Sequence, residues 1–185
     1  MLLSLTLPLL LAPLTMAADV QKVFVGRGEI HVLNYTSFDA TGPADKIGCL
    51  NEFGLLTFDD CAVFTRKEKN PAFLASPLGG ACSFRNQNMP TNKDSYYGKD
   101  SHAWSCRESP ADNLEEVYYT VRGFNYPFIC NGNLGCTYDI PNAPTPERRV
   151  QPVWQFFWGS HQMGITPGHL EVVWLWVPVG KGDRE

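Results

Sequence analysis

The histidines are the residues of this chain best suited to moving protons or binding a metal ion. His161 and His169 flank a glycine-containing break, Gly159–Gly168, and Glu171 lies two residues beyond His169. Side chains two apart on a strand share one face of a sheet. If the break joins two paired strands, we expect His161, His169 and Glu171 to converge into an acid/base cluster or a copper or zinc site.

The competing interpretation is that these histidines are loop residues with ordinary hydrogen-bond partners. Their spacing matches no strong metal motif such as His-Glu-x-x-His. His31 and His102 lie far away in the sequence. We therefore predict no resident metal or cofactor, and we keep a small hydrolase or metal-dependent enzyme as the alternative to a binding protein.

A ribonuclease site is a further alternative, because the residue types that it needs are present in Glu29, His31, His102, Arg148 and Arg149. Residue types alone do not establish geometry. The formal net charge of -4 argues against a protein that follows phosphates along a nucleic acid. The sequence also lacks a Gly-x-Ser-x-Gly elbow and a phosphate-binding glycine loop. Two neighbouring acids, Asp59 and Asp60, point opposite ways on an extended segment, so a turn explains them better than a catalytic pair.

The N-terminus has the layout of a secretory signal peptide. Leu2–Leu14 is apolar and is followed by small residues before Asp19. Two prolines interrupt this run, which is shorter than the roughly 20 residues of a membrane span. We expect residues 1–18 to be removed, leaving one secreted domain over 19–185 with a disordered tail at 180–185. No later segment predicts membrane insertion.

Six cysteines after a signal peptide predict three disulfide bonds. Many pairings are possible, and proximity in the sequence favours bridges between consecutive cysteines. A zinc site is the rival, but no Cys-x-x-Cys pair is present. The favoured bridges are Cys49–Cys61, Cys82–Cys106 and Cys130–Cys136.

The elements that must position these residues are predicted to be strands. Val20–Tyr35 reads as two short strands split at Gly26–Gly28, and Asn51–Gly54 reads as a reversal between two more. Helical periodicity is nearly absent, with Ser109–Glu116 the one candidate helical turn. We therefore predict an all-β, single-domain antiparallel sandwich or barrel of about six to nine strands.

The last apolar block, Val150–Val179, holds most of the tryptophans. Leu170–Val177 is apolar on both faces, which predicts a strand inside the fold. If the two halves of the block pair as a hairpin, Trp154 should lie opposite Trp174, with the histidine-bearing loop at the tip. Trp154, Trp158 and Trp104 are predicted either as core residues or as exposed platforms for sugars.

Contact regions are predicted in two loops, Phe84–Ser101 and Gly159–Gly168. The first is long and polar, and bridging Cys82 to Cys106 would tether its ends. Asn34-Tyr35-Thr36 is an N-glycosylation sequon, which requires an exposed Asn34. Arg148–Arg149 is a possible dibasic processing site, but a cut there would release the tryptophan-rich block without a disulfide, so we expect an intact loop. The candidate contact residues are Tyr96, Tyr97, Trp104 and Trp158.

One stretch carries a family resemblance. Ile47–Asn51, followed by Gly54, Thr57 and Cys61–Phe64, together with the signal peptide and the expected bridges, resembles small cysteine-containing proteins secreted by filamentous fungi. These proteins are discussed as effector candidates, and the resemblance implies an extracellular and frequently non-enzymatic role. We accordingly expect a secreted binding protein that recognises an extracellular protein or glycan of a host or cell wall.

Overall fold

The computed structural model describes residues 24–67, 73–107, 116–132, 135–156 and 163–180. Within these ranges the chain is built from strands, and the one helical segment is the short 3-10 helix η2 (Pro43–Asp45). The predicted all-β antiparallel fold is confirmed. Four predictions fall wholly or largely outside the described residues: the signal peptide, the helical turn at Ser109–Glu116, the roles of Trp158 and His161, and the tail beyond Gly180.

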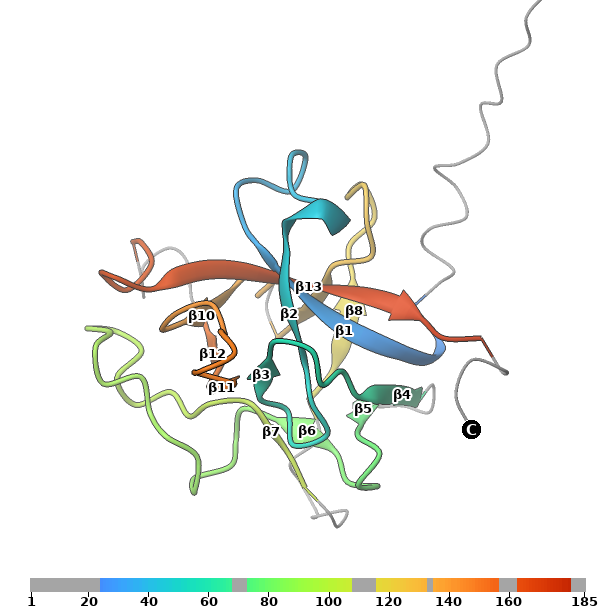
Figure 1. Cartoon of the computed structure of the whole chain (residues 1–185), viewed down its shortest axis with the longest axis horizontal. Helices are drawn as coiled ribbons and strands as arrows, with labels where there is room; N and C mark the ends of the chain where they lie inside the picture. Colours follow the sequence, from blue (N-terminus) through green and yellow to red (C-terminus); the bar gives the residue numbers. More distant parts are fainter. Residues whose placement is uncertain (1–23, 68–72, 108–115, 133–134, 157–162, 181–185) are drawn as a thin grey trace, which may run out of the picture.

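Two long strands form the centre of the molecule. β1 (Gly26–Asn34) pairs antiparallel with β13 (Leu170–Pro178) over most of their lengths, from Gly28 opposite Pro178 to Asn34 opposite Val172. They run side by side across Figure 1, in blue and red. The side chains of β13 are buried on both faces from Val172 to Trp176, which confirms the prediction that this strand lies in the interior.

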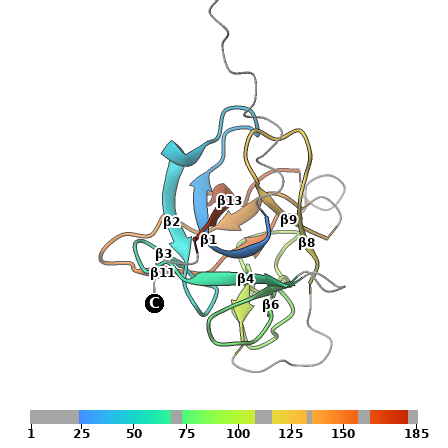
Figure 2. The same ribbon diagram turned by 90° about the vertical axis from the view of Figure 1, so that its right-hand side faces the viewer.

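β1 has two different partners along its second edge, and this curls the sheet. Its first half pairs with β4 (Val63–Lys67), while His31–Leu33 pairs with β2 (Lys46–Leu50). The register shifts between Val32 and Leu33. Figure 2 shows β2 and β3 on one side of the central pair and β8 and β9 on the other.

Short strands extend this sheet in both directions. The path runs β11-β3-β2-β1-β13-β10-β12, and β5 joins the edge of β4, giving nine strands. β6–β7 and β8–β9 form two further, separate two-stranded ladders. The remaining bounds are β3 (Leu56–Thr57), β5 (Phe73–Ala75), β6 (Cys82–Ser83), β7 (Ser105–Cys106), β8 (Tyr118–Thr120), β9 (Ile129–Asn131), β10 (Tyr138–Ile140), β11 (Val150–Gln151) and β12 (Trp154–Gln155).

The two faces of β13 bury two separate cores. Trp174 stacks on Tyr138 with ring centroids 3.7 Å apart and lies 4.9 Å from the Trp104 ring. These rings belong to the larger core. Val173 and Leu175 point the other way, into a smaller cluster with Leu33 and Phe128. A strand with apolar residues at successive positions therefore has a partner for each face.

All three disulfides join the cysteine pairs that proximity favoured: Cys49–Cys61, Cys82–Cys106 and Cys130–Cys136. The first bridge links β2 to the segment after β3, and the turn at Asn51–Gly54 reverses the chain between these strands as predicted. The second joins β6 directly to β7, which brings together the ends of the long polar loop.

The predicted break at Gly26–Gly28 is misplaced, because β1 already begins at Gly26 and the chain bends before it, at Phe24 and Val25. The physical reason is packing. A Cβ atom built on Gly28 would lie 2.5 Å from the indole ring of Trp176. Glycine is needed here so that the large ring can approach the backbone, and the chain does not turn at this point.

The predicted hairpin between the two tryptophan-bearing segments is also wrong. β10 lies between β12 and β13, with Asp139 opposite Trp154 on one side and opposite Glu171 on the other. Trp154 therefore pairs with Asp139 and not with Trp174. A pattern within the last block could not reveal that a strand from outside it is inserted between its halves.

Candidate functional site

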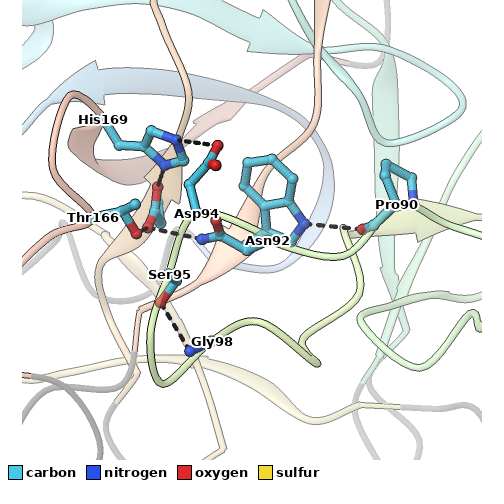
Figure 3. Close-up of polar contacts among 9 residues, drawn as sticks. Pro90, Asn92, Asp94, Ser95, Gly98, Thr166 and His169 are labelled. Atoms are coloured by element: carbon cyan, nitrogen blue, oxygen red, sulfur yellow. Dashed lines mark hydrogen bonds and ion pairs between the residues drawn. The ribbon is translucent and has the colours of Figure 1, made fainter.

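A cluster of polar side chains is centred on Asp139 in β10. This side chain is fully buried. Its carboxylate accepts hydrogen bonds from Asn92 Nδ2 at 3.0 Å and Thr166 Oγ1 at 2.5 Å, and His169 Nδ1 lies 2.6 Å from its other oxygen. Figure 3 shows the side chains of Asn92, Thr166 and His169 gathered at this point. A buried carboxylate is stable only when its oxygens are satisfied in this way.

Asp139 fixes the orientation of the His169 ring. A carboxylate can only accept hydrogen bonds, so Nδ1 of His169 carries a proton. The ring also lies nearly parallel to Trp154, with centroids 6.0 Å apart. Nε2, on the other side of this largely buried ring, lies 3.7 Å from a carboxylate oxygen of Asp94, which is 79% exposed. An imidazole held at Nδ1 by a buried acid is suited to exchange a proton at Nε2.

The same contacts hold two loops against the sheet. Asn92 belongs to the Phe84–Ser101 loop, and Thr166 precedes β13. Trp154 Nε1 also donates to Pro90 O in the long loop at 3.0 Å. The loop is light green in Figure 1 and lies beside β10 and β12. Asp139 is therefore a structural anchor for the loop as well as the partner of His169.

The predicted cluster of His161, His169 and Glu171 is replaced by a different set of residues among those described. His161 lies outside the described residues. His169 bonds to Asp139, whereas Glu171 accepts a hydrogen bond from the side chain of Thr137. Burial raises the pKa of Glu171, Thr137 opposes this, and the nearby Asp139 raises it further.

Sequence reasoning missed Asp139, Asn92 and Thr166. A weak signal for Asp139 was present, since it is a charged residue between the strand-forming Tyr138 and Ile140. Asn92 and Thr166 gave no such signal, because asparagine and threonine are ordinary residues of polar loops.

The Phe84–Ser101 loop presents two of the predicted contact residues. Tyr96 and Tyr97 are 83% and 56% exposed. Their rings meet edge to face, with centroids 4.8 Å apart and planes at 81°. The turn that carries them is closed by hydrogen bonds from Gly98 N to Ser95 Oγ at 2.8 Å and from Asn92 N to Ser101 O at 3.2 Å.

Trp104 is not a surface residue. It is fully buried, and its Nε1 donates to Tyr118 Oη at 2.6 Å. This burial contradicts its prediction as a contact residue, and the core alternative is correct for Trp104. Trp154 is also buried.

The residues considered for a ribonuclease do not assemble. His102 Nδ1 lies 2.9 Å from Met89 O inside the long loop. His31 contacts Glu29 at 2.9 Å and Lys46 Nζ at 3.3 Å. Two strands, β2 and β3, separate β1 from β11, which begins directly after Arg149.

Glu29 and His31 also lie near Cys61, in a grouping of metal-binding residue types. Cys61 is in a disulfide, and thiolates rather than disulfide sulfurs bind metal ions strongly. The neighbouring Lys46 ammonium lies 4.0 Å from Cys61 Sγ and disfavours a cation. This grouping therefore supports an ion-pair network better than a metal site.

The structure shows the surroundings of the predicted glycosylation and processing sites. Asn34 is exposed at the end of β1, as a glycosylated asparagine must be. Arg148 and Arg149 are exposed, and their segment is held by a bond from Arg148 N to Thr145 Oγ1 at 3.1 Å. Glycosylation and processing stay predictions.

A scan against protein-family models, a search of curated proteins and a search of solved structures each returned no match. Among the described residues, no helix has the length and apolarity needed to cross a membrane. The three disulfides are compatible with an extracellular location.

Proposed function

We propose that this protein is a secreted binding protein that recognises an extracellular protein or glycan of a host or cell wall without catalysing a reaction on it. The observation that carries the proposal is the exposed pair Tyr96 and Tyr97 at the tip of a tethered loop. Tyrosine combines a large apolar ring with a polar hydroxyl, and it is enriched at binding sites for that reason.

The loop is ordered before any partner arrives. The Cys82–Cys106 bridge joins its ends, Asn92 is bonded to the buried Asp139, and Ser95 closes the turn beneath the tyrosines. A contact surface that is already fixed loses less conformational entropy on binding than a mobile one. This favours a recognition role for the loop over a role as a simple connection.

The crossed arrangement of the two rings bears on the kind of partner. Planes at 81° cannot both lie flat against one surface. A flat crystalline polysaccharide would therefore engage a single ring, whereas a protein surface or a soluble glycan chain can contact a ring face and a ring edge together.

The test is a binding screen with the Tyr96→Ala/Tyr97→Ala double variant. The probes are a soluble glycan array, insoluble cellulose and chitin, and immobilised host extracellular extract. The control is Phe58→Ala, which removes an aromatic ring that is 50% exposed from a different segment. We expect the double variant to lose binding to a soluble glycan or protein target that wild type and Phe58→Ala both retain. Full retention by the double variant would contradict the proposal.

A catalytic role is the second candidate, and the 2.6 Å contact between His169 and Asp139 is the observation that favours it. An acid that orients a histidine through Nδ1 is also the arrangement found in hydrolases. The contact of His169 Nε2 is the Asp94 carboxylate rather than a hydroxyl, and the cysteines are all in bridges. Metal analysis of purified protein, and hydrolase assays comparing wild type with His169→Ala, test this role. Equal background rates and no bound metal would reject it.

A further inference from the structure

A second site lies on the opposite side of β13 from the large tryptophan core. It is an open cavity of about 540 Å³, a volume typical of small-molecule pockets. Its floor adjoins the smaller apolar cluster around Leu33 and Phe128. Its lining includes Tyr35, Phe38, Phe124, Thr137 and Glu171.

Aromatic rings that pack against one another form one wall of this cavity. Phe38 and Phe124 stack with centroids 4.1 Å apart and planes at 10°, although 85 residues separate them in the chain. Tyr35 packs against Phe38 at 5.0 Å, and Phe38 and Phe124 both contact the fully buried Phe128. The rings are therefore held in place before a ligand binds, and they present apolar and π surface to it.

The polar groups of the cavity converge on Glu171. Thr137 donates a hydrogen bond to this carboxylate. Tyr35 lies close enough that Glu171 raises the pKa of its hydroxyl, after the larger effect of burial. A pocket with apolar walls and a few convergent polar groups has the general character of a ligand site.

The charge at this end is negative and is not balanced by a cation among the described residues. Glu171 forms no ion pair with a described lysine, arginine or histidine. A second carboxylate, Asp139, lies opposite Glu171 in the ladder of β10 and β13, and its charge raises the pKa of Glu171. A partly buried carboxylate of this kind is stabilised by a cationic hydrogen-bond donor.

We propose that this cavity binds a small organic cation, with an amine or ammonium group at Glu171 and an apolar body against Phe38 and Phe124. The carboxylate supplies the charge, and the aromatic rings add cation–π attraction and apolar contact. This site is separate from the loop that carries Tyr96 and Tyr97, so either proposal can fail without the other.

The test uses three ligands that share an apolar body and differ in the head group: 4-phenylbutylamine, 4-phenylbutanol and 4-phenylbutanoate. Binding to the full chain is measured by protein NMR titration at neutral pH, with Glu171→Gln as the matched variant. We expect the amine to shift resonances of the cavity residues and to bind most tightly. Glu171→Gln should weaken amine binding roughly tenfold or more and leave alcohol binding unchanged.

A parallel titration of Tyr96→Ala/Tyr97→Ala should match wild type for the amine. Three outcomes would overturn the proposal: alcohol and amine binding equally, the carboxylate binding best, or no ligand shifting the cavity residues. Retention of full amine affinity in a Glu171→Gln protein with a native spectrum would overturn it as well.

Discussion

Nδ1 of His169 lies 2.6 Å from Oδ1 of Asp139, a carboxylate that is fully buried and also accepts bonds from Asn92 and Thr166. Three separate segments thus meet at one side chain. The contact with His169 gives the histidine its orientation, and the bond that Asn92 donates to the same carboxylate holds the loop that carries the exposed tyrosines. On the proposed binding function, Asp139 would therefore couple the stability of the fold to the position of the contact loop.

The first prediction is that Asp139→Asn strongly destabilises the protein. The amide keeps the shape but replaces one acceptor with a donor that faces the donors of its neighbours. Removing one partner of a buried charged network costs about 3–5 kcal/mol. Urea denaturation measures this loss. Asp94→Asn is the control, because Asp94 is 79% exposed and its contact should contribute less than about 1 kcal/mol. Equal stabilities for the two variants would show that Asp139 is not the anchor.

Residue patterns predicted the parts of this fold that depend on local chemistry. The two-faced apolarity of Leu170–Val177 identified the central strand, and cysteine proximity identified the three bridges. Both follow from properties of neighbouring residues. Strand order did not follow, because the insertion of β10 between β12 and β13 depends on which distant strands fit together.

The candidate site was only partly predictable for the same reason. His169 was recognised from its type, and Tyr96 and Tyr97 from their place in a long polar loop. Their partners come from elsewhere: Asp139 is 30 residues from His169 in the chain, and Asn92 is 47 from Asp139. Gly28 shows the converse error, since a glycine needed for contact with Trp176 has the same sequence signal as one in a turn.

The second prediction concerns the turn that packs on Trp104. Gly54 has a φ of 86°, and an added Cβ would lie 2.8 Å from the Trp104 ring. Gly54→Ala should lower the free energy of unfolding by about 1–2 kcal/mol, because alanine is strained at this positive φ. Overpacking against the Trp104 ring should lower it by about 1–3 kcal/mol more. Gly79→Ala is the matched control, with a φ of 91° and open space around the added carbon. Thermal or urea denaturation should show the larger loss for Gly54→Ala, and the reverse order would contradict the packing argument.

The third prediction is a pH dependence that arises from Glu116. Burial raises the pKa of this carboxyl, although hydrogen bonds from Tyr118 and others and the nearby Arg85 act against the shift. Between the ordinary and the raised pKa, the folded state holds more protons than the unfolded state. The contribution of Glu116 to the free energy of unfolding therefore falls as pH rises through that window.

Glu116→Gln removes this contribution, and Gln can still accept the bond that Tyr118 Oη donates at 2.9 Å. Relative to wild type, the variant should become more stable as pH rises from about 4 to 7. Urea midpoints at several pH values measure the difference. A difference that stays constant or shrinks with rising pH would contradict the assignment to Glu116.

The fourth prediction compares two buried disulfides that close loops of different length. Cys82–Cys106 spans 24 residues and Cys130–Cys136 spans 6. Because a cross-link restricts the unfolded chain more when its loop is longer, replacing both cysteines by alanine should cost about 3.5 kcal/mol for the first bridge and about 2.4 kcal/mol for the second. Denaturation of both double variants measures these losses.

Cys82→Ala/Cys106→Ala should also weaken binding through Tyr96 and Tyr97, since this bridge joins the ends of their loop. Cys130→Ala/Cys136→Ala should leave that binding intact. An equal loss of binding in both variants would mean that general destabilisation, and not the tether, controls recognition.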